Sequence, residues 1–445
     1  MAEKDHMKCL IIAAGKGSRL RQKYYSKPLV PVLGVPIIER VIRNAARAGI
    51  SDFYVVTGYK GEEVRHYLDG LKRRCHFNIT HIINDDWDAG NGISVIKAED
   101  KLKGNFLLMM GDHLVDPELI RRLIDQRLPP GEVTLAIERD TNCPLVNLDD
   151  ATKVWTNNGK LRDIGKDLES FNAFDTGVFL CSPAIFDGIS ESISRYGDST
   201  LSGGVRCLAK KGRVNVWDTG GRFWIDIDDP VSLSKAEEAL LQSIPIKKND
   251  GPVSRVFNRP ISTRLSKYLA RLPLTPNLIS IMSFVLSMLG AGLFLLGSYP
   301  ALLAGGIMAQ LASIVDGCDG EIARLKYQES AYGGWLDAVL DRYADAFLLF
   351  GLTWHVYLTR KDPSSILVGF MAVIGSFMVS YTADKYDSLM HSRIGKGYLR
   401  IGRDIRVLLI FLGATLNLPF LTLCLMGATM NAEVLRRMIL CRGSG

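Results

Sequence analysis

The chain has 445 residues and a formal net charge of +7, with 47% hydrophobic and 23% charged residues. This length suggests two or three domains, and the apolar content excludes a disordered chain. The 42 glycines follow no triplet period and the eight cysteines form no Cys-x-x-Cys pair, which excludes collagen, a disulfide scaffold and a cysteine-based zinc site.

Residues 1–245 are predicted to form a soluble α/β domain. Short apolar runs bounded by Gly, Asp and Asn alternate with amphipathic stretches such as 36–48 and 117–126. Buried strands that alternate with helices indicate a Rossmann-like, mainly parallel mixed sheet with helices on both faces. The apolar runs are 9–14, 53–57, 106–110, 133–137 and 178–181.

The first apolar run leads into a loop that contains Gly15 and Gly17, followed by Arg19 and then by Lys27 in a Lys-Pro-Leu sequence. Glycines let the backbone approach a phosphate closely, and nearby cations neutralise its charge. A glycine turn alone also closes ordinary strand–helix junctions, but two cations beside it favour triphosphate binding. The segment resembles the sugar-nucleotidyltransferase family, whose signature combines these features.

The resemblance continues in chain order and implies further contacts with substrate. Asn91 and Ser94 stand where related enzymes read the base and ribose of the nucleotide. Lys166 and Asp175 match the segments that contact a sugar or alcohol phosphate. Taken alone, Lys166 is equally explained as a solvated loop cation.

Three carboxylates are the predicted metal ligands of this first domain. Asp112 follows an apolar strand, at the carboxyl end where α/β proteins bind their ligands. Asp226 and Asp228 face the same way at strand spacing, although each is also explained as a surface carboxylate. Hard oxygen ligands suit Mg²⁺ or Mn²⁺. We predict that Arg19 and Lys27 are catalytic cations that neutralise the phosphates of a nucleoside triphosphate.

Residues 246–272 are predicted to be a linker and a juxtamembrane helix. Residues 246–251 are polar, whereas residues 255–271 carry five basic residues, no acidic one and interleaved apolar residues. This pattern is typical of a helix that lies in a membrane interface with its cations toward lipid phosphates. A solvated linker helix is the alternative.

Residues 273–445 are predicted to form an all-α domain with six membrane spans. The third candidate stretch carries carboxylates and the fifth is short for the roughly 20 residues that a span needs. The basic residues between the stretches indicate an integral membrane protein whose two termini and two active sites face the cytoplasm. The stretches are 279–297, 301–315, 336–358, 366–382, 407–418 and 420–432.

Four carboxylates lie at membrane depth in the second and third stretches. Asp316 and Asp319 are three residues apart, and Asp337 and Asp341 are four apart, so each pair lines one helix face. Such a cluster requires divalent cations, unless the carboxylates are only helix-end charges that reach the interface. The pattern Asp-x2-Asp-Gly-x2-Ala-Arg-x8-Gly-x3-Asp-x3-Asp resembles the signature of the CDP-alcohol phosphotransferase family.

This resemblance implies roles for individual residues. Asp316, Asp319 and Asp337 would bind metal together with Asp341, which would also remove the proton of the acceptor hydroxyl. Asp345 is open to interpretation as a hydrogen-bonding partner of basic residues. The residues implied to contact the nucleotide are Asn277, Gly320, Ala323 and Arg324.

The acceptor is predicted to carry a phosphate that binds to basic residues in the last third of the domain. Arg393, Lys396, Arg403 and Arg406 are the candidates. A positive-inside loop alone would explain most of these cations. Arg403 and Arg406, however, begin a predicted span, where a cation must face a partner.

The two predicted activities are consecutive, since one makes a CDP-alcohol and the other consumes it. Their pairing resembles the family of bifunctional inositol-1-phosphate cytidylyltransferases and di-myo-inositol phosphate phosphate synthases. It implies that CTP and inositol 1-phosphate give CDP-inositol, from which a second inositol 1-phosphate displaces CMP in osmolyte biosynthesis. A phospholipid synthase and a non-enzymatic membrane-tethered nucleotide sensor are the alternatives. We expect no nucleic-acid partner, and a homodimer is an open prediction.

Overall fold

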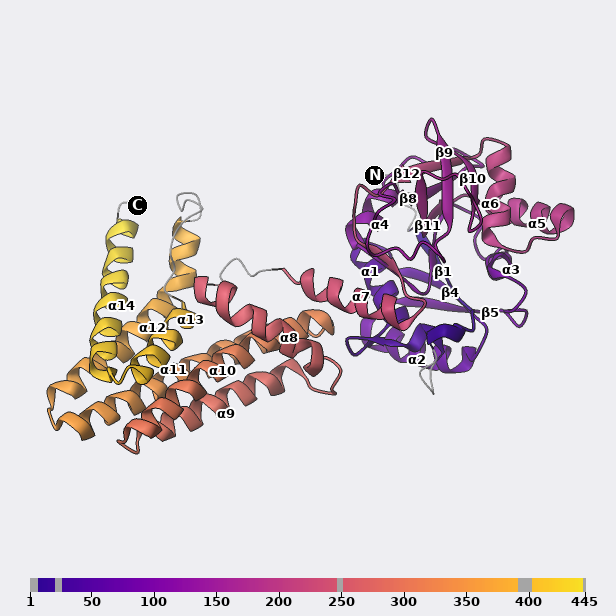
Figure 1. Ribbon diagram of the computed structural model, residues 1–445. Helices are drawn as coiled ribbons and strands as arrows, with labels where there is room; N and C mark the ends of the chain where they lie inside the picture. Colours follow the sequence, from indigo (N-terminus) through magenta and orange to yellow (C-terminus); the bar gives the residue numbers. More distant parts are fainter. Residues whose placement is uncertain (1–6, 21–25, 246–250, 391–401, 443–445) are drawn as a thin grey trace. The chain divides into compact units, whose positions relative to one another are not determined.

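The computed structural model describes residues 7–20, 26–245, 251–390 and 402–442. The chain divides into two compact units, Met1–Ala239 (unit 1) and Leu240–Gly445 (unit 2), and each is described by itself (Figure 1). Two predicted acceptor-phosphate residues, Arg393 and Lys396, lie outside the described residues.

Unit 1 is built on a nine-stranded sheet with the order β5-β4-β1-β6-β11-β8-β12-β10-β9. Strands β5, β4, β1 and β6 run parallel to one another, whereas β11 is antiparallel to both β6 and β8. The sheet is therefore mixed: β8 and β12 form a further parallel pair, and the pairings of β9, β10 and β11 are all antiparallel. The strands are β1 Lys8–Ala13, β4 Asp52–Thr57, β5 Asn78–Ile83, β6 Phe106–Met110, β8 Val133–Glu138, β9 Lys153–Asn157, β10 Lys160–Gly165, β11 Ala173–Cys181 and β12 Val214–Asp218.

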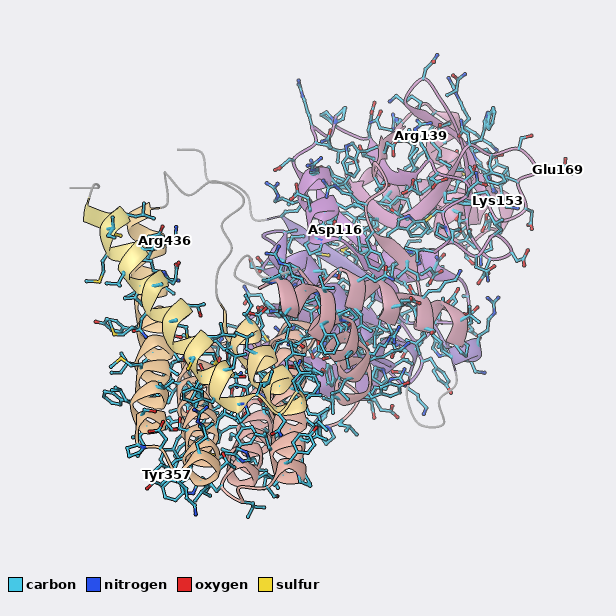
Figure 2. The ribbon with its side chains drawn as sticks, turned by 60° about the vertical axis from the view of Figure 1, so that its left-hand side comes forward. Asp116, Arg139, Lys153, Glu169, Tyr357 and Arg436 are labelled. Atoms are coloured by element: carbon cyan, nitrogen blue, oxygen red, sulfur yellow. The ribbon has the colours of Figure 1, made fainter. Side chains whose placement is uncertain are left out.

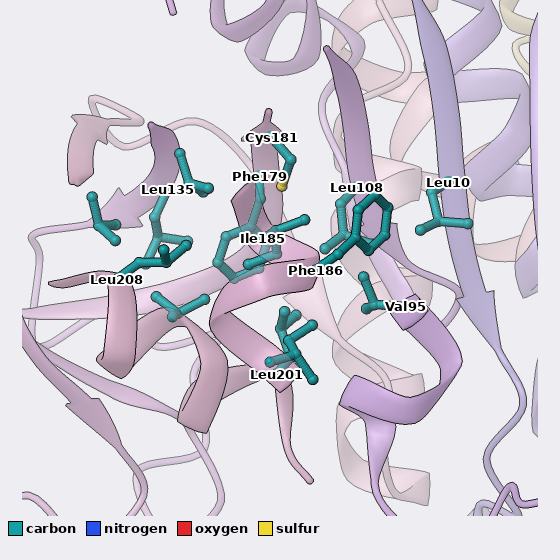
Figure 3. Close-up of a cluster of buried hydrophobic side chains, with 14 of the residues drawn as sticks. Leu10, Val95, Leu108, Leu135, Phe179, Cys181, Ile185, Phe186, Leu201 and Leu208 are labelled. Carbon is teal, nitrogen blue, oxygen red and sulfur yellow. The ribbon is translucent and has the colours of Figure 1, made fainter. Parts of the chain in front are cut away.

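Helices cover the sheet because each presents one apolar face to it. Phe179 of β11, Leu108 of β6 and the helical residues Ile185 and Phe186 meet in one buried cluster (Figure 3). The helices of this unit are α1 Ile37–Arg47, α2 Gly61–Cys75, α3 Asn91–Ile96, α4 Pro117–Ile124, α5 Ala184–Tyr196, α6 Leu201–Lys210 and α7 Pro230–Gln242.

Two pairings bring distant parts of unit 1 to one edge of the sheet. Parallel β1 and β6 are neighbours, so the glycine loop after β1 and Asp112 after β6 leave the sheet side by side. A second, two-stranded sheet joins β7 (His113–Val115) to β13 (Trp224–Asp226) and sets Asp226 opposite His113. The strand ends thus gather the predicted metal-binding segments.

Unit 2 is entirely helical in its described residues. After the last residues of α7, it continues with η3 (Ser254–Asn258) and α8 (Arg259–Leu269), and α10 packs against α8, α9 and α13. Figure 1 shows α9, α10 and α11 running alongside one another. The other helices are α9 Pro276–Phe294, α10 Tyr299–Leu325, α11 Ala331–Arg360, α12 Ser364–Met390, α13 Arg403–Thr415 and α14 Pro419–Arg442.

Three of the described helices are long and apolar enough to cross a membrane: α9, α10 and the segment Ser364–Ala383 of α12. The 30 residues of α11 include several carboxylates, and the 13 residues of α13 rise only about 20 Å. Large apolar side chains such as Leu296, Leu367 and Phe370 are more than half exposed, which suits a surface that meets lipid. Tyr357 of α11 and Arg436 of α14 mark opposite ends of this unit (Figure 2).

Candidate active sites

A buried lysine is the centre of the site in unit 1. The Lys27 side chain is 8% exposed, and its Nζ lies 2.5 Å from Asp112 Oδ2, in direct contact with Asp228 and 4.0 Å from Asp226 Oδ1. Burial alone would lower the pKa of Lys27, but these three carboxylates outweigh it and raise the pKa. Gly17 permits the approach, because a Cβ there would overlap the Lys27 side chain.

His113 faces the same carboxylates. Its Nδ1 donates to the Thr176 carbonyl at 2.8 Å, and its Nε2 lies 3.4 Å from Asp226 Oδ2 and 3.7 Å from Asp112 Oδ1. Burial lowers the pKa of His113, but Asp226 and Asp112 raise it to about 10. Gly177 has a φ of +74° and leaves room for the imidazole, which a Cβ at this position would overlap.

A cavity of about 690 Å³ opens onto these groups. Asn91 and Asp175 line it, and Asp175 Oδ1 accepts a hydrogen bond from the Gly177 N–H at 2.7 Å. Burial raises the pKa of Asp175 to about 6. Asn91 also accepts from the Leu201 N–H, while Ser94 is 2% exposed and accepts from the Asn84 amide. Ser94 therefore has a partner within the fold.

Arg19 and Lys166 meet on one carboxylate that the sequence reasoning did not single out. Arg19 Nη1 contacts Asp150 Oδ2, and Lys166 Nζ lies 2.6 Å from Asp150 Oδ1. Gly15, on the same loop as Arg19, is exposed, and a Cβ there would meet no other atom of the described structure within 4 Å. The two predicted phosphate-binding cations thus lie together although they are 147 residues apart in the sequence.

Three of the four membrane-domain carboxylates gather in unit 2. Oxygens of Asp316, Asp337 and Asp341 lie within 4.8 Å of one another, as the two helix faces predict. The fourth, Asp319, is 8% exposed and accepts a hydrogen bond from Ser280 at 2.5 Å. All four carboxylates line one cavity of unit 2, whose volume is about 960 Å³.

Two arginines at the start of α13 face this cluster. Arg403 Nη1 lies 2.8 Å from Asp316 Oδ2 and 2.6 Å from Asp341 Oδ1. Asp345 accepts ion pairs from both arginines, at 3.5 Å from Arg403 Nε and 3.0 Å from Arg406 Nη2. Both predicted phosphate-binding arginines therefore line the cavity, and Asp345 is indeed a partner of basic residues.

The residues expected to contact the nucleotide lie on α9 and α10. Arg324 lines the cavity together with Gly317 and Asp319. Asn277, at the first turn of α9, stands beside Gly333 at the first turn of α11, where a Cβ would lie 3.1 Å from its Oδ1. Gly320 and Ala323 are small residues on the same helix as Asp319.

Sequence reasoning missed four polar residues at these sites: His113, Asp150, Ser280 and Ser283. Ser283 donates to Asp316 Oδ1 at 3.1 Å, as Ser280 does to Asp319. The serines had a signal, since positions 280, 283 and 287 share one face of an otherwise apolar helix. His113 and Asp150 had none, because their partners come from remote strands and loops.

Both clusters suit a divalent cation of oxygen preference. Asp112 and Asp226 in unit 1, and Asp316, Asp337 and Asp341 in unit 2, bring carboxylate oxygens to within 4.8 Å of one another. One Asp226 oxygen is buried and accepts no hydrogen bond from the described residues. Cations and carboxylates beside a cavity large enough for a nucleotide suit phosphoryl transfer, which depends on positioning and charge neutralisation.

Two protein-family models match the chain, one in each unit. Residues 9–171 match the MobA-like NTP transferase domain, and residues 273–435 match the CDP-alcohol phosphatidyltransferase family.

Known proteins resemble the chain over nearly its whole length or over part of it. A bifunctional IPC transferase and DIPP synthase from Rubrobacter xylanophilus is 36% identical over 96% of this chain and 95% of its own length. An archaetidylinositol phosphate synthase from Pyrococcus horikoshii is 36% identical over 35% of this chain and 76% of its own. The structure of the inositol-1-phosphate CTP transferase from T. maritima matches 52% of this chain and 94% of its own with a TM-score of 0.47 and 24% identity.

Proposed function

Because the chain belongs to the family of bifunctional IPC transferases and DIPP synthases, we propose that it catalyses two consecutive transfers. Unit 1 is a cytidylyltransferase that converts CTP and inositol 1-phosphate to CDP-inositol and pyrophosphate. Unit 2 is a CDP-alcohol phosphotransferase that moves the inositol phosphate group to a second inositol 1-phosphate and releases CMP. The observation that carries the proposal is the similarity of the whole chain to one two-step enzyme, with an acidic, cation-bearing cavity in each unit.

In the first reaction, a phosphate oxygen of inositol 1-phosphate attacks the α-phosphorus of CTP. The bond from that phosphorus to the β-phosphate oxygen breaks, and pyrophosphate leaves. Lys27 and Arg19 neutralise the triphosphate, while Lys166 and Asp175 bind the alcohol phosphate. We assign base and ribose contacts to Asn91 and, less directly, Ser94.

A divalent cation, Mg²⁺ or Mn²⁺, held by Asp112, Asp226 and Asp228 would supply further charge neutralisation at the phosphates. The backbone loop of Gly15 and Gly17 lets the phosphates approach.

In the second reaction, a hydroxyl of the acceptor attacks the phosphorus that bears inositol in CDP-inositol. The bond to the CMP oxygen breaks and CMP leaves, while Asp341 takes the hydroxyl proton. Arg403 and Arg406, with Arg393 and Lys396, bind the acceptor phosphate. The side chains of Arg403 and Arg406 line the cavity and are 11% and 3% exposed, which supports this assignment.

The donor side of unit 2 is assigned to α9 and α10. Asp316, Asp319 and Asp337, with Asp341, would hold one or two divalent cations that neutralise the diphosphate. Asn277, Gly320, Ala323 and Arg324 would contact the cytidine diphosphate, with the two small residues allowing close approach.

The architecture completes the proposal. We assign residues 1–245 to a cytoplasmic transferase domain, 246–272 to the juxtamembrane segment and 273–445 to six membrane spans with both termini in the cytoplasm. The exposed apolar residues of η3 and α8 support contact with lipid, since Val256 of η3 is 80% exposed and Tyr268 of α8 is 67% exposed. The basic residues Arg264 and Lys267 lie on the same helix as Tyr268. The soluble diester product suits osmolyte biosynthesis.

The test uses the full chain in detergent with CTP, inositol 1-phosphate and Mg²⁺. Both pyrophosphate and CMP should appear without added lipid. Asp341→Asn should stop CMP release and let CDP-inositol accumulate, whereas Asp112→Asn should stop pyrophosphate release yet still convert supplied CDP-inositol. Continued CMP release by Asp341→Asn would refute its role as the base.

A lipid-linked second reaction is the runner-up, and the similarity of about a third of the chain to an archaetidylinositol phosphate synthase favours it. In that case, CMP release requires an added lipid substrate. When the inositol 1-phosphate carries a radioactive label on its inositol, the label should enter the organic phase on extraction. CMP release in lipid-free detergent, with the label in water, excludes this alternative.

A further inference from the structure

One carboxylate joins the two cations that serve different substrates of the first reaction. Asp150 gives one oxygen to Arg19 Nη1 and the other to Lys166 Nζ, the latter at 2.6 Å. The three residues come from the loop after β1, the segment between β8 and β9, and the residue that follows β10. Their meeting is therefore a product of the tertiary fold.

The carboxylate of Asp150 is largely buried, whereas the two cations that contact it are largely exposed. The Asp150 side chain is 15% exposed, but those of Arg19 and Lys166 are 59% and 56% exposed. Contact with two cations offsets the cost of burying the negative charge of Asp150. Asp150 is thus a fixed anion to which two long, otherwise mobile side chains are tied.

The two cations keep hydrogen-bond donors for substrate. A guanidinium has five N–H groups and an ammonium has three, and the contacts with Asp150 use one nitrogen of each. The remaining donors can bind phosphate oxygens while the carboxylate stays in contact. Holding a long side chain in its bound position before the ligand arrives removes an ordering cost that otherwise weakens binding by up to roughly tenfold for each side chain.

We propose that Asp150 is a positioning residue shared by both substrates of unit 1: it holds Arg19 for the triphosphate and Lys166 for the alcohol phosphate before either binds. This inference rests on the proposed cytidylyl transfer. The joint anchor sets the attacking phosphate and the α-phosphorus at a fixed separation, because the cations that hold them share one carboxylate.

The test compares full-length variants by calorimetric binding of Mg²⁺-CTP and of inositol 1-phosphate, and by the kinetics of pyrophosphate release. Asp150→Asn should weaken both ligands about fivefold to tenfold and raise both KM values to match. Asp150→Glu, which keeps the charge, should recover part of both losses. Lys166→Met should weaken inositol 1-phosphate more than CTP. The control Glu169→Gln removes an exposed carboxylate of the same unit (Figure 2) and should change neither.

Three results would overturn the inference. If Asp150→Asn bound both ligands with unchanged affinity and lowered only the fraction of active protein, the carboxylate would have a purely structural role. Weakening of one ligand alone would show that Asp150 does not serve both. Tighter CTP binding would show that the carboxylate competes with the phosphates. Wild-type protein that binds both ligands but releases no pyrophosphate would contradict the proposed function instead, and the binding comparison would still decide the role of Asp150.

Discussion

Replacing Arg403 by alanine should destabilise unit 2 in a way that divalent cations reverse. Arg403 is 11% exposed and its guanidinium contacts Asp316, Asp341 and Asp345 at 2.8, 2.6 and 3.5 Å. Without it, these carboxylates lose a common cation in a site with little access to water. Removing one partner of a buried ion pair typically costs about 3–5 kcal/mol.

This cost converts into a measurable melting shift. For a unit of this size, each kcal/mol moves the Tm by about 2–4 °C, so Arg403→Ala in the presence of EDTA should lower the Tm of unit 2 by roughly 6–20 °C. A ligand at 100 times its Kd adds about 2.7 kcal/mol to the folded state. Saturating Mg²⁺ or Mn²⁺ should therefore recover a large part of the loss, because the metal replaces the missing charge.

The Tm shift is measured by thermal unfolding of the full chain in detergent. Hydrogen exchange assigns the transition to α10 and α11. Arg436→Ala is the control, since Arg436 is 42% exposed and pairs with Glu433 within α14. An exposed pair of this kind contributes at most about 1 kcal/mol, independent of metal. An Arg403→Ala shift of the same size with EDTA and with Mg²⁺ would refute the view that Arg403 neutralises metal-binding carboxylates.

Three further substitutions test the two sites separately. Burial raises the pKa of Asp175 to about 6 in the folded state, above its usual value of 3.8. The folded state therefore binds this proton more tightly than the unfolded state does, and the stability of unit 1 falls as the pH rises from about 4 to 6. Asp175→Asn should flatten this fall and stabilise unit 1 at pH 7 by up to roughly 3 kcal/mol in denaturant titrations. Lys27→Met should reduce pyrophosphate release by at least about a hundredfold, while supplied CDP-inositol still yields CMP at the wild-type rate. Ser280→Ala removes the hydrogen bond to Asp319, a charge-assisted contact of about 1.5–3 kcal/mol, and should slow CMP release about tenfold or more without changing pyrophosphate release.

Local patterns in the sequence predicted much of each site. Asp337 and Asp341 are one helical turn apart, so any helix carries them on one face, and the structure has them beside Asp316. Gly17 and Lys27 were predicted separately as phosphate-binding residues, and the structure adds that the lysine side chain packs where a Cβ of the glycine would be. Periodicity and spacing are sufficient wherever a site is built from one or two neighbouring elements.

The rest of the sites depends on pairings that no local pattern reveals. His113 meets Asp226 because β7 pairs with β13, more than a hundred residues away in the chain. Asp150 lies in an irregular segment whose place is set by the strands that flank it. The apolar runs predict six spans, but three described helices meet the criteria of length and composition. Helix α11 carries Asp337, Asp341 and Asp345, and α13 is short.

The two sites share one electrostatic arrangement. Each sets one buried cation, Lys27 or Arg403, among three aspartates that would otherwise repel one another. A carboxylate already paired with a cation attracts a bare metal ion less strongly, whereas phosphate oxygens can bind both the metal and the protein's cation. We therefore expect each site to bind Mn²⁺ weakly alone and at least about tenfold more tightly with CTP or a CDP-alcohol. Calorimetric titration of Mn²⁺ with and without nucleotide measures this coupling, and equal affinities would show that the buried cations do not compete with the metal.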